Sequence, residues 1–161
     1  IRGKLVTGVQ TCALPISCAE PNFDSLIPAG SNGVHNADSV ELYFNDPKTG
    51  KTVRVAANAG GMLDAGDLSG VTAFARMFPE KKEFVISITV PRALLPPGNE
   101  WKMNACRNRP RRYDEPANQW TNAAWARLPK GNNYAASEFF GTVRLDAAAP
   151  QSDSHRKSVK P

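Results

Sequence analysis

The sequence has no stretch of about 20 uninterrupted apolar residues, the length that a membrane-spanning helix needs. It also lacks the short motifs of several common catalytic sites, since no G-x-S-x-G, H-E-x-x-H or phosphate-binding loop pattern occurs. Histidine is scarce, with only His35 and His155 present. We therefore expect neither a membrane partner nor the enzyme classes that these motifs define.

The middle of the chain carries little net charge. The net charge is +5 and the pI is 9.3, but residues 1–17 and residues 150–161 each contribute +2. The remaining body carries about +1, too little for the basic surface that phosphate backbones attract. Its one basic cluster, residues 106–113, is followed by Asp114 and Glu115. We therefore expect no nucleic-acid partner.

Cysteines and paired carboxylates are too few or too scattered to define a site. Cys12, Cys18 and Cys106 show no metal-ligand spacing, and the spacing leaves open whether Cys18 pairs with Cys106. A glycosidase would need two carboxylates facing each other across a cleft, and nothing in the sequence pairs its Asp and Glu residues in this way. We predict a chain that is not itself an enzyme and that holds no cofactor.

The two ends of the chain differ from its middle. Residues Val6–Ile16, VTGVQTCALPI, resemble the translation of a common short-read sequencing adapter. The polar residues within this stretch also argue against a signal peptide. We therefore expect residues 1–17 to be artefactual and to lie outside the domain. The domain is expected to span residues 18–146 with its first strands missing, and residues 147–161 to form a linker or tail, artefactual at its end.

The strongest pattern in the body of the chain is an alternation of polar and apolar residues with a period of two, which is typical of half-buried strands. In SVELYFN it places Val40, Leu42 and Phe44 on one face. The pattern predicts strands over Ser39–Asn45, Thr52–Ala57, Val71–Phe78, Glu83–Val90, Trp101–Arg107 and Phe140–Asp146. With hairpin turns and no helical period, the sequence predicts an all-β, antiparallel sandwich of jelly-roll-like or immunoglobulin-like type, incomplete at its N-terminus.

A long stretch between Arg107 and Phe140 has no regular period and is rich in Arg, Asn and aromatic residues. Loops of this length in a compact domain are usually functional or disordered, and the rings argue against disorder. Sugars present apolar C–H faces and a rim of hydroxyls, which flat rings and planar polar groups recognise. The composition therefore suggests a glycan site, although the same rings could fill a core under the loop.

Several motifs follow the order found in the family-nine carbohydrate-binding modules and their relatives. The chain resembles this family from Cys18 to Asp146 through Asp38–Leu42, Val53–Val55 with Asn58 and Gly60–Gly61, Phe84–Pro91, Trp101–Asn104 with Arg107, Trp120, and Phe140–Leu145. The resemblance implies a β-sandwich that binds glycans without cleaving them. It also implies attachment to a secreted polysaccharide-degrading enzyme.

In sugar-binding members of that family, two aromatic rings enclose a sugar while a Glu and an Arg bond its hydroxyls. By position, the resemblance assigns the polar roles to Glu41 and Arg54 and one ring to Tyr134. The second ring is replaced by His35, which offers less stacking surface. The family's structural calcium has no identifiable ligands here. The predicted glycan-binding residues are Glu41, Arg54, Asn104, Arg107, Trp120, Trp125, Tyr134 and His35.

Two other functions stay open at this point. The sandwich could be purely structural and brace a neighbouring catalytic domain. It could also be a redox module that holds haem through a Met and a His, for which Met62, Met77, Met103 and His35 are candidates. The leading expectation is a noncatalytic module of an extracellular or periplasmic protein, with a polysaccharide or oligosaccharide as its partner and a catalytic domain in the same chain.

Overall fold

The computed structural model describes residues 11–28, 33–110, 121–126 and 133–144. In this part of the chain all regular elements are strands or short 3-10 segments, and no α-helix occurs. None of the described helical segments is long or apolar enough to cross a membrane. The prediction of an all-β protein is therefore confirmed.

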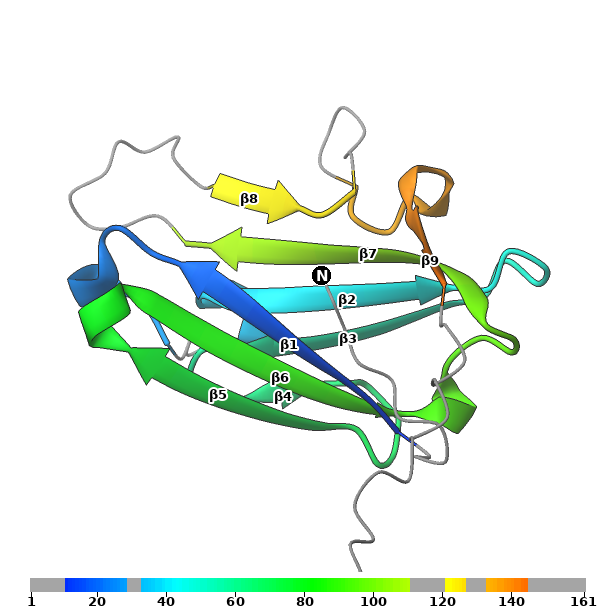
Figure 1. Cartoon of the computed structure of the whole chain (residues 1–161), viewed down its shortest axis with the longest axis horizontal. Helices are drawn as coiled ribbons and strands as arrows, with labels where there is room; N and C mark the ends of the chain where they lie inside the picture. Colours follow the sequence, from blue (N-terminus) through cyan, green and yellow to red (C-terminus); the bar gives the residue numbers. More distant parts are fainter. Residues whose placement is uncertain (1–10, 29–32, 111–120, 127–132, 145–161) are drawn as a thin grey trace, which may run out of the picture.

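The strands form two antiparallel sheets that pack against each other (Figure 1). The three-stranded sheet has the order β1 (Thr11–Ala19), β6 (Glu83–Pro91), β5 (Thr72–Phe78). The six-stranded sheet has the order β4 (Leu63–Asp64), β3 (Thr52–Asn58), β2 (Ser39–Asn45), β7 (Glu100–Arg109), β8 (Thr121–Ala124), and β9 (Gly141–Arg144) also pairs with β7. This is the predicted antiparallel sandwich.

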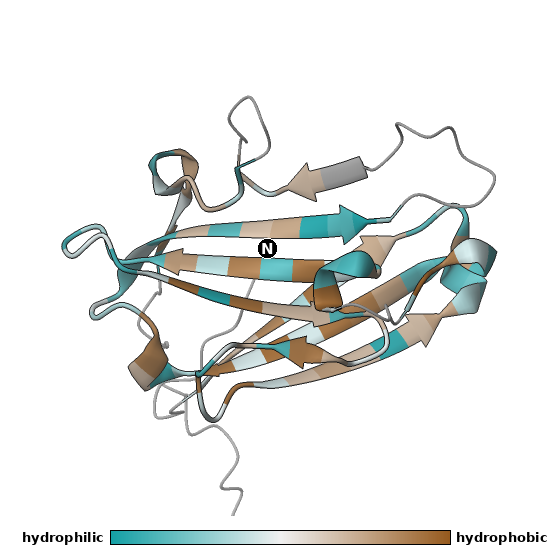
Figure 2. Cartoon of the chain, turned by 180° about the vertical axis from the view of Figure 1, so that it is seen from behind, coloured by the Kyte–Doolittle hydropathy of each residue, from teal (hydrophilic) through white to brown (hydrophobic). Residues whose placement is uncertain are grey.

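The core lies between the two sheets and follows the alternation seen in the sequence. In β2, Leu42 and Phe44 point inward, and in β6 Ile86 and Ile88 do so, all with at most 1% exposure. Burying a side chain of this size contributes roughly 1.5–3 kcal/mol. Apolar segments of both sheets accordingly face each other in Figure 2. Trp101 closes the core at the start of β7, with the Arg92 guanidinium 4.9 Å from its ring centre.

Strand β1 departs from the prediction, because residues 11–17 were expected to lie outside the domain and no strand was predicted there. They pair instead with β6 in continuous antiparallel register, from Thr11 opposite Pro91 to Ala19 opposite Glu83. The physical reason is a period of two, which buries Cys12 and Leu14 and leaves the residues between them exposed. The sheet therefore starts before Cys18, where the domain was expected to begin.

Two further strands were missed because they are too short to show a period. Strand β4 has only two residues, and β8 has four and lies inside the stretch that was predicted to be a loop. The last predicted strand, Phe140–Asp146, is observed as β9 over Gly141–Arg144. The expected tail, residues 147–161, lies outside the described residues.

Candidate functional site

A cluster of polar side chains covers the face of the six-stranded sheet that points away from the three-stranded sheet. It arises from register, because Tyr43 of β2 lies between Arg54 of β3 and Asn104 of β7. Side chains opposite each other in antiparallel strands share a face and are close enough to interact. We call the following residues the outer polar cluster: Ser39, Glu41, Tyr43, Arg54, Asp64, Asn104 and Asn108.

Glu41 is the centre of the outer polar cluster and is only 6% exposed. Its Oε2 accepts hydrogen bonds from the Tyr43 hydroxyl and from Arg54 Nε, both at 2.6 Å. Its Oε1 accepts one from Asn108 Nδ2 at 2.7 Å. Burial acts to raise the pKa of Glu41, but the hydrogen bonds from Tyr43, Arg54 and Asn108 outweigh it and hold that pKa below its usual value. The buried carboxylate is therefore ionised, and both of its oxygens accept hydrogen bonds.

Arg54 connects this buried carboxylate to the surface. Its Nη1 donates to Asp64 Oδ2 at 2.8 Å, and this hydrogen bond is the main reason that the pKa of Asp64 is lowered. The side chains of Arg54 and Asp64 are 35% and 41% exposed. Among the described residues, no group accepts a hydrogen bond from Arg54 Nη2. The guanidinium is thus held by two carboxylates and remains partly exposed at the edge of the outer polar cluster.

An aromatic layer borders the outer polar cluster. The rings of Tyr43 and Phe140 lie with their centres 6.1 Å apart, and Cys106 is buried beside them. Tyr134 packs against this group and is partly buried. Tyr43 links the two groups, because its hydroxyl donates to Glu41 and its cluster contacts Tyr134.

Asn104 and Trp125 position the segment that follows β8. Asn104 Oδ1 accepts a hydrogen bond from the Ala126 N–H at 3.0 Å, and the Trp125 N–H donates to the Ala105 carbonyl at 2.8 Å. The six-membered ring of Trp125 lies against Gly141, where an added Cβ would come within 2.5 Å of it. Trp125 is nevertheless 46% exposed, so it offers ring surface to solvent.

The remaining predicted residues lie in different surroundings. His35 is exposed in the 3-10 segment Val34–Asn36, which packs against β2 and β3. Trp120 lies outside the described residues. Met103, a candidate haem ligand, is buried in the main core. No group of three or more His, Cys, Asp or Glu residues suited to a metal occurs in the described ranges.

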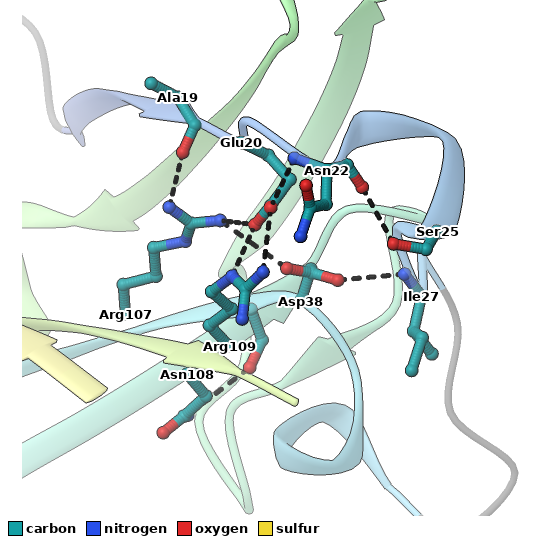
Figure 3. A network of polar contacts seen from close by, with 10 residues as sticks. Ala19, Glu20, Asn22, Ser25, Ile27, Asp38, Arg107, Asn108 and Arg109 are labelled. Carbon is teal, nitrogen blue, oxygen red and sulfur yellow. Dashed lines mark hydrogen bonds and ion pairs between the residues drawn. The ribbon is translucent and has the colours of Figure 1, made fainter. Parts of the chain in front are cut away.

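Arg107 is not part of the outer polar cluster, although it was predicted to bind the glycan together with Glu41, Arg54 and Asn104. It lies opposite Val40 in the register, on the inward-facing side of the sheet. Its Nη2 donates to Glu20 Oε2 at 2.7 Å and its Nη1 to the Ala19 carbonyl at 2.6 Å (Figure 3). Arg109 donates to the same Glu20 carboxylate, which is completely buried. Arg107 therefore stabilises the fold by joining β7 to the end of β1.

Four members of the outer polar cluster were not among the predicted glycan-binding residues, namely Ser39, Tyr43, Asp64 and Asn108. The signal for Asn108 was present, because the alternation in β7 puts residues 104, 106 and 108 on one face and residue 107 on the other. Tyr43 likewise shares the Glu41 face by the period of two. Asp64 gave no such signal, because it lies in a strand of two residues.

The cysteines lie on different sides of the six-stranded sheet. Cys18 belongs to the main core, whereas Cys106 belongs to the aromatic layer on the outer face, and both are free thiols. Burial is the main reason that the pKa of Cys18 is raised to about 11 and that of Cys106 to about 12. The pairing that the spacing left open is therefore absent.

Stability is expected to fall at both ends of the pH range. The pKa values of Glu41 and Asp64 are lowered by folding, so their contribution is complete above about pH 4.3 and is lost as the pH falls through the folded values. The thiols act in the opposite sense, because their contribution is lost as the pH rises from about 8.5 towards 11 and 12. Urea denaturation as a function of pH measures both limbs.

The expected fall in the free energy of unfolding at high pH can be tested with a variant of its own. Cys106→Ala should make the loss of stability above about pH 8.5 less steep without changing the acid limb, because only the thiol has been removed. An alkaline limb of unchanged slope in this variant would contradict the assignment to buried thiols.

Comparison with known proteins gives no further guide to this site. No protein-family model matches the chain, and no curated protein matches it in sequence.

Proposed function

We propose that the domain binds neutral glycans without cleaving them, at the exposed edge of the outer polar cluster. The observation that carries this proposal is the arrangement of Arg54, which is held between Glu41 and Asp64 and still has Nη2 available among the described residues. Glu41 is too buried to reach a ligand. Its role is to position Arg54, which is a change from the direct role that the family resemblance implied.

The exposed edge offers a donor and an acceptor side by side. Arg54 Nη2 can donate to one hydroxyl, and the exposed carboxylate of Asp64 can accept from a neighbouring one. Two adjacent hydroxyls on a sugar ring match this pair. Tyr134 offers ring surface on the same side of the sheet, as the C–H faces of sugars require. Trp125 lies against Gly141, which pairs with the core residue Met103, so its exposed ring lies on the other side of the sheet.

The charges of the cluster favour neutral over acidic sugars. Glu41 and Arg54 compensate each other at 2.6 Å, so Asp64 leaves the exposed edge with a negative charge. An acidic sugar would be repelled by this carboxylate, whereas a neutral hydroxyl can donate to it. Oligosaccharides of glucan, xylan, mannan or galactan are therefore better candidates than uronic-acid polymers.

Arg54→Ala tests the proposal directly. Loss of a hydrogen bond from a charged group to a sugar hydroxyl should weaken binding by about 1–3 kcal/mol, measured by isothermal titration with neutral oligosaccharides. Arg144→Ala is the matched control, because Arg144 is an exposed arginine that forms an ion pair with Glu100, away from the outer polar cluster. Equal affinities of the two variants would contradict the site.

The wider setting of the domain is also a proposal. The family resemblance supports a module of a larger extracellular or periplasmic protein, joined to a domain that degrades polysaccharides. If the folded chain binds none of the neutral glycans, bracing of such a catalytic domain becomes the better proposal.

A further inference from the structure

In the part of the chain that the structure describes, strand β5 is an edge of the three-stranded sheet, and its other side pairs with no strand (Figure 1). It has seven residues, TAFARMF, with no proline and with Arg76 as its only charge. The other edge strand of this sheet, β1, contains Pro15, and the edge strand β4 of the other sheet has only two residues. Short strands and prolines protect sheet edges from pairing with another chain. Of these edges, β5 is therefore the one best suited to pairing.

Large apolar side chains of β5 are exposed to solvent. Phe74 is 66% exposed and Met77 is 38% exposed, on opposite faces of the strand. Between Phe74 and Phe78 lies Arg76, whose guanidinium is 4.9 Å from the Phe78 ring centre. An exposed apolar edge of this kind marks a contact surface.

We propose that a second copy of this chain pairs with β5 in antiparallel register about Ala75. This register places Phe74 of each copy opposite Arg76 of the other, and Ala73 opposite Met77 of the other. An antiparallel pair centred on one residue has twofold symmetry. The contact is therefore complete in a dimer, because the β5 edges of both copies are paired. The two three-stranded sheets become one continuous sheet of both copies.

The charge of Arg76 selects this register from its neighbours. Pairing about Arg76 would place two guanidinium groups directly opposite each other, which is destabilising. Pairing about Phe74 would place Arg76 opposite Thr72 and away from the exposed ring. Shifts by one residue would turn the exposed face of one copy against the core face of the other. Pairing about Ala75 puts each guanidinium opposite the exposed Phe74 ring, a favourable cation–π arrangement.

The dimer does not depend on the proposed glycan function. The outer polar cluster belongs to the six-stranded sheet, whereas β5 belongs to the three-stranded sheet. Both sites of a dimer would therefore remain accessible, and the outcome of the glycan titration does not bear on the pairing.

Sedimentation of the full chain over a wide range of concentration tests the pairing. The mass is expected to rise from that of the 17.4 kDa chain towards twice that value. Phe74→Lys places two ammonium groups opposite the two Arg76 side chains and should leave a monomer. Ser17→Lys adds the same charge to an exposed position on the other edge strand and should leave the dimer intact. A wild-type chain that stays monomeric, or equal masses for both variants, would overturn the proposal.

Cross-linking tests the register and does not require the Phe74 variant to fold. In Ala75→Cys the two introduced thiols face each other across the twofold axis, with Cβ atoms about 4.5–5.5 Å apart, so mild oxidation should give a covalent dimer. Ala73→Cys is the control, because its thiol lies opposite Met77 and should cross-link far less. The native cysteines are buried and should contribute little. Equal cross-linking of the two variants would contradict pairing about Ala75.

Discussion

Glu20→Ala is expected to lower the free energy of unfolding by about 3–5 kcal/mol, as found when one partner of a buried ion pair is removed. The Glu20 carboxylate is completely buried and accepts hydrogen bonds from Arg107, Arg109 and the Asn22 N–H (Figure 3). Without it, two guanidinium groups that are only 19% and 15% exposed lose their main anion. Asp38, at 3.6 Å from Arg107, replaces it only in part.

Glu100→Ala is the matched control for this prediction. Glu100 accepts a hydrogen bond from Arg144 at 2.8 Å, but the two side chains are 55% and 73% exposed. Exposed pairs of this kind contribute about 0–1 kcal/mol. Urea denaturation of both variants should therefore give clearly different losses. Similar losses would mean that the contacts of Glu20 with Arg107 and Arg109 do not hold β1 and the segment after it against β7.

Glu41→Ala is the second large effect that we expect, and it should act on stability and on binding together. Removal of this buried carboxylate leaves the Tyr43 hydroxyl and the Asn108 amide without their acceptor and takes one of two anions from Arg54. We expect a loss of about 3 kcal/mol in the free energy of unfolding, because buried polar groups would lose their partners. Glycan affinity should fall because Arg54 is no longer held in place.

A double-mutant cycle separates a positioning role of Glu41 from direct contact with the ligand. If Glu41 acts only through Arg54, its replacement should have no further effect on affinity in the Arg54→Ala background. The loss of stability should persist there, since Tyr43 and Asn108 still lack their acceptor. Independent, additive losses of affinity would instead show that Glu41 touches the sugar itself.

Much of the sandwich could be predicted because strands with one buried face have a period of two. Ser39–Asn45 was predicted with its bounds, since Val40, Leu42 and Phe44 alternate with other residues. The expectation that this strand is half-buried was wrong, because the outer polar cluster and the rings beside it bury its second face as well. Strand β1 was not predicted, although Cys12 and Leu14 show the same alternation. Its residues resemble an adapter sequence and were therefore expected to lie outside the domain. Strand β4 has too few residues for any pattern to appear.

The site was predictable only as far as single strands allow. The alternation placed Glu41 and Arg54 on polar faces, and the structure brings them to 2.6 Å. Sequence alone could not give the pairing of β2 with β7, which brings Asn108 to Glu41 across 67 positions of the chain. It also assigned Arg107 to the ligand, whereas the register turns that residue towards Glu20.

The buried cysteines of this protein can report local opening of the fold. Cys12 and Cys18 are shielded by the contact of β1 with β6, and Cys106 by the layer that includes Phe140. A thiol reagent in excess therefore reads the opening of each half separately, because modification at either place requires the cover to move. The ratio of the labelling rate of the β1 cysteines to that of Cys106 would show whether the core between the sheets or the outer aromatic layer opens first under native conditions.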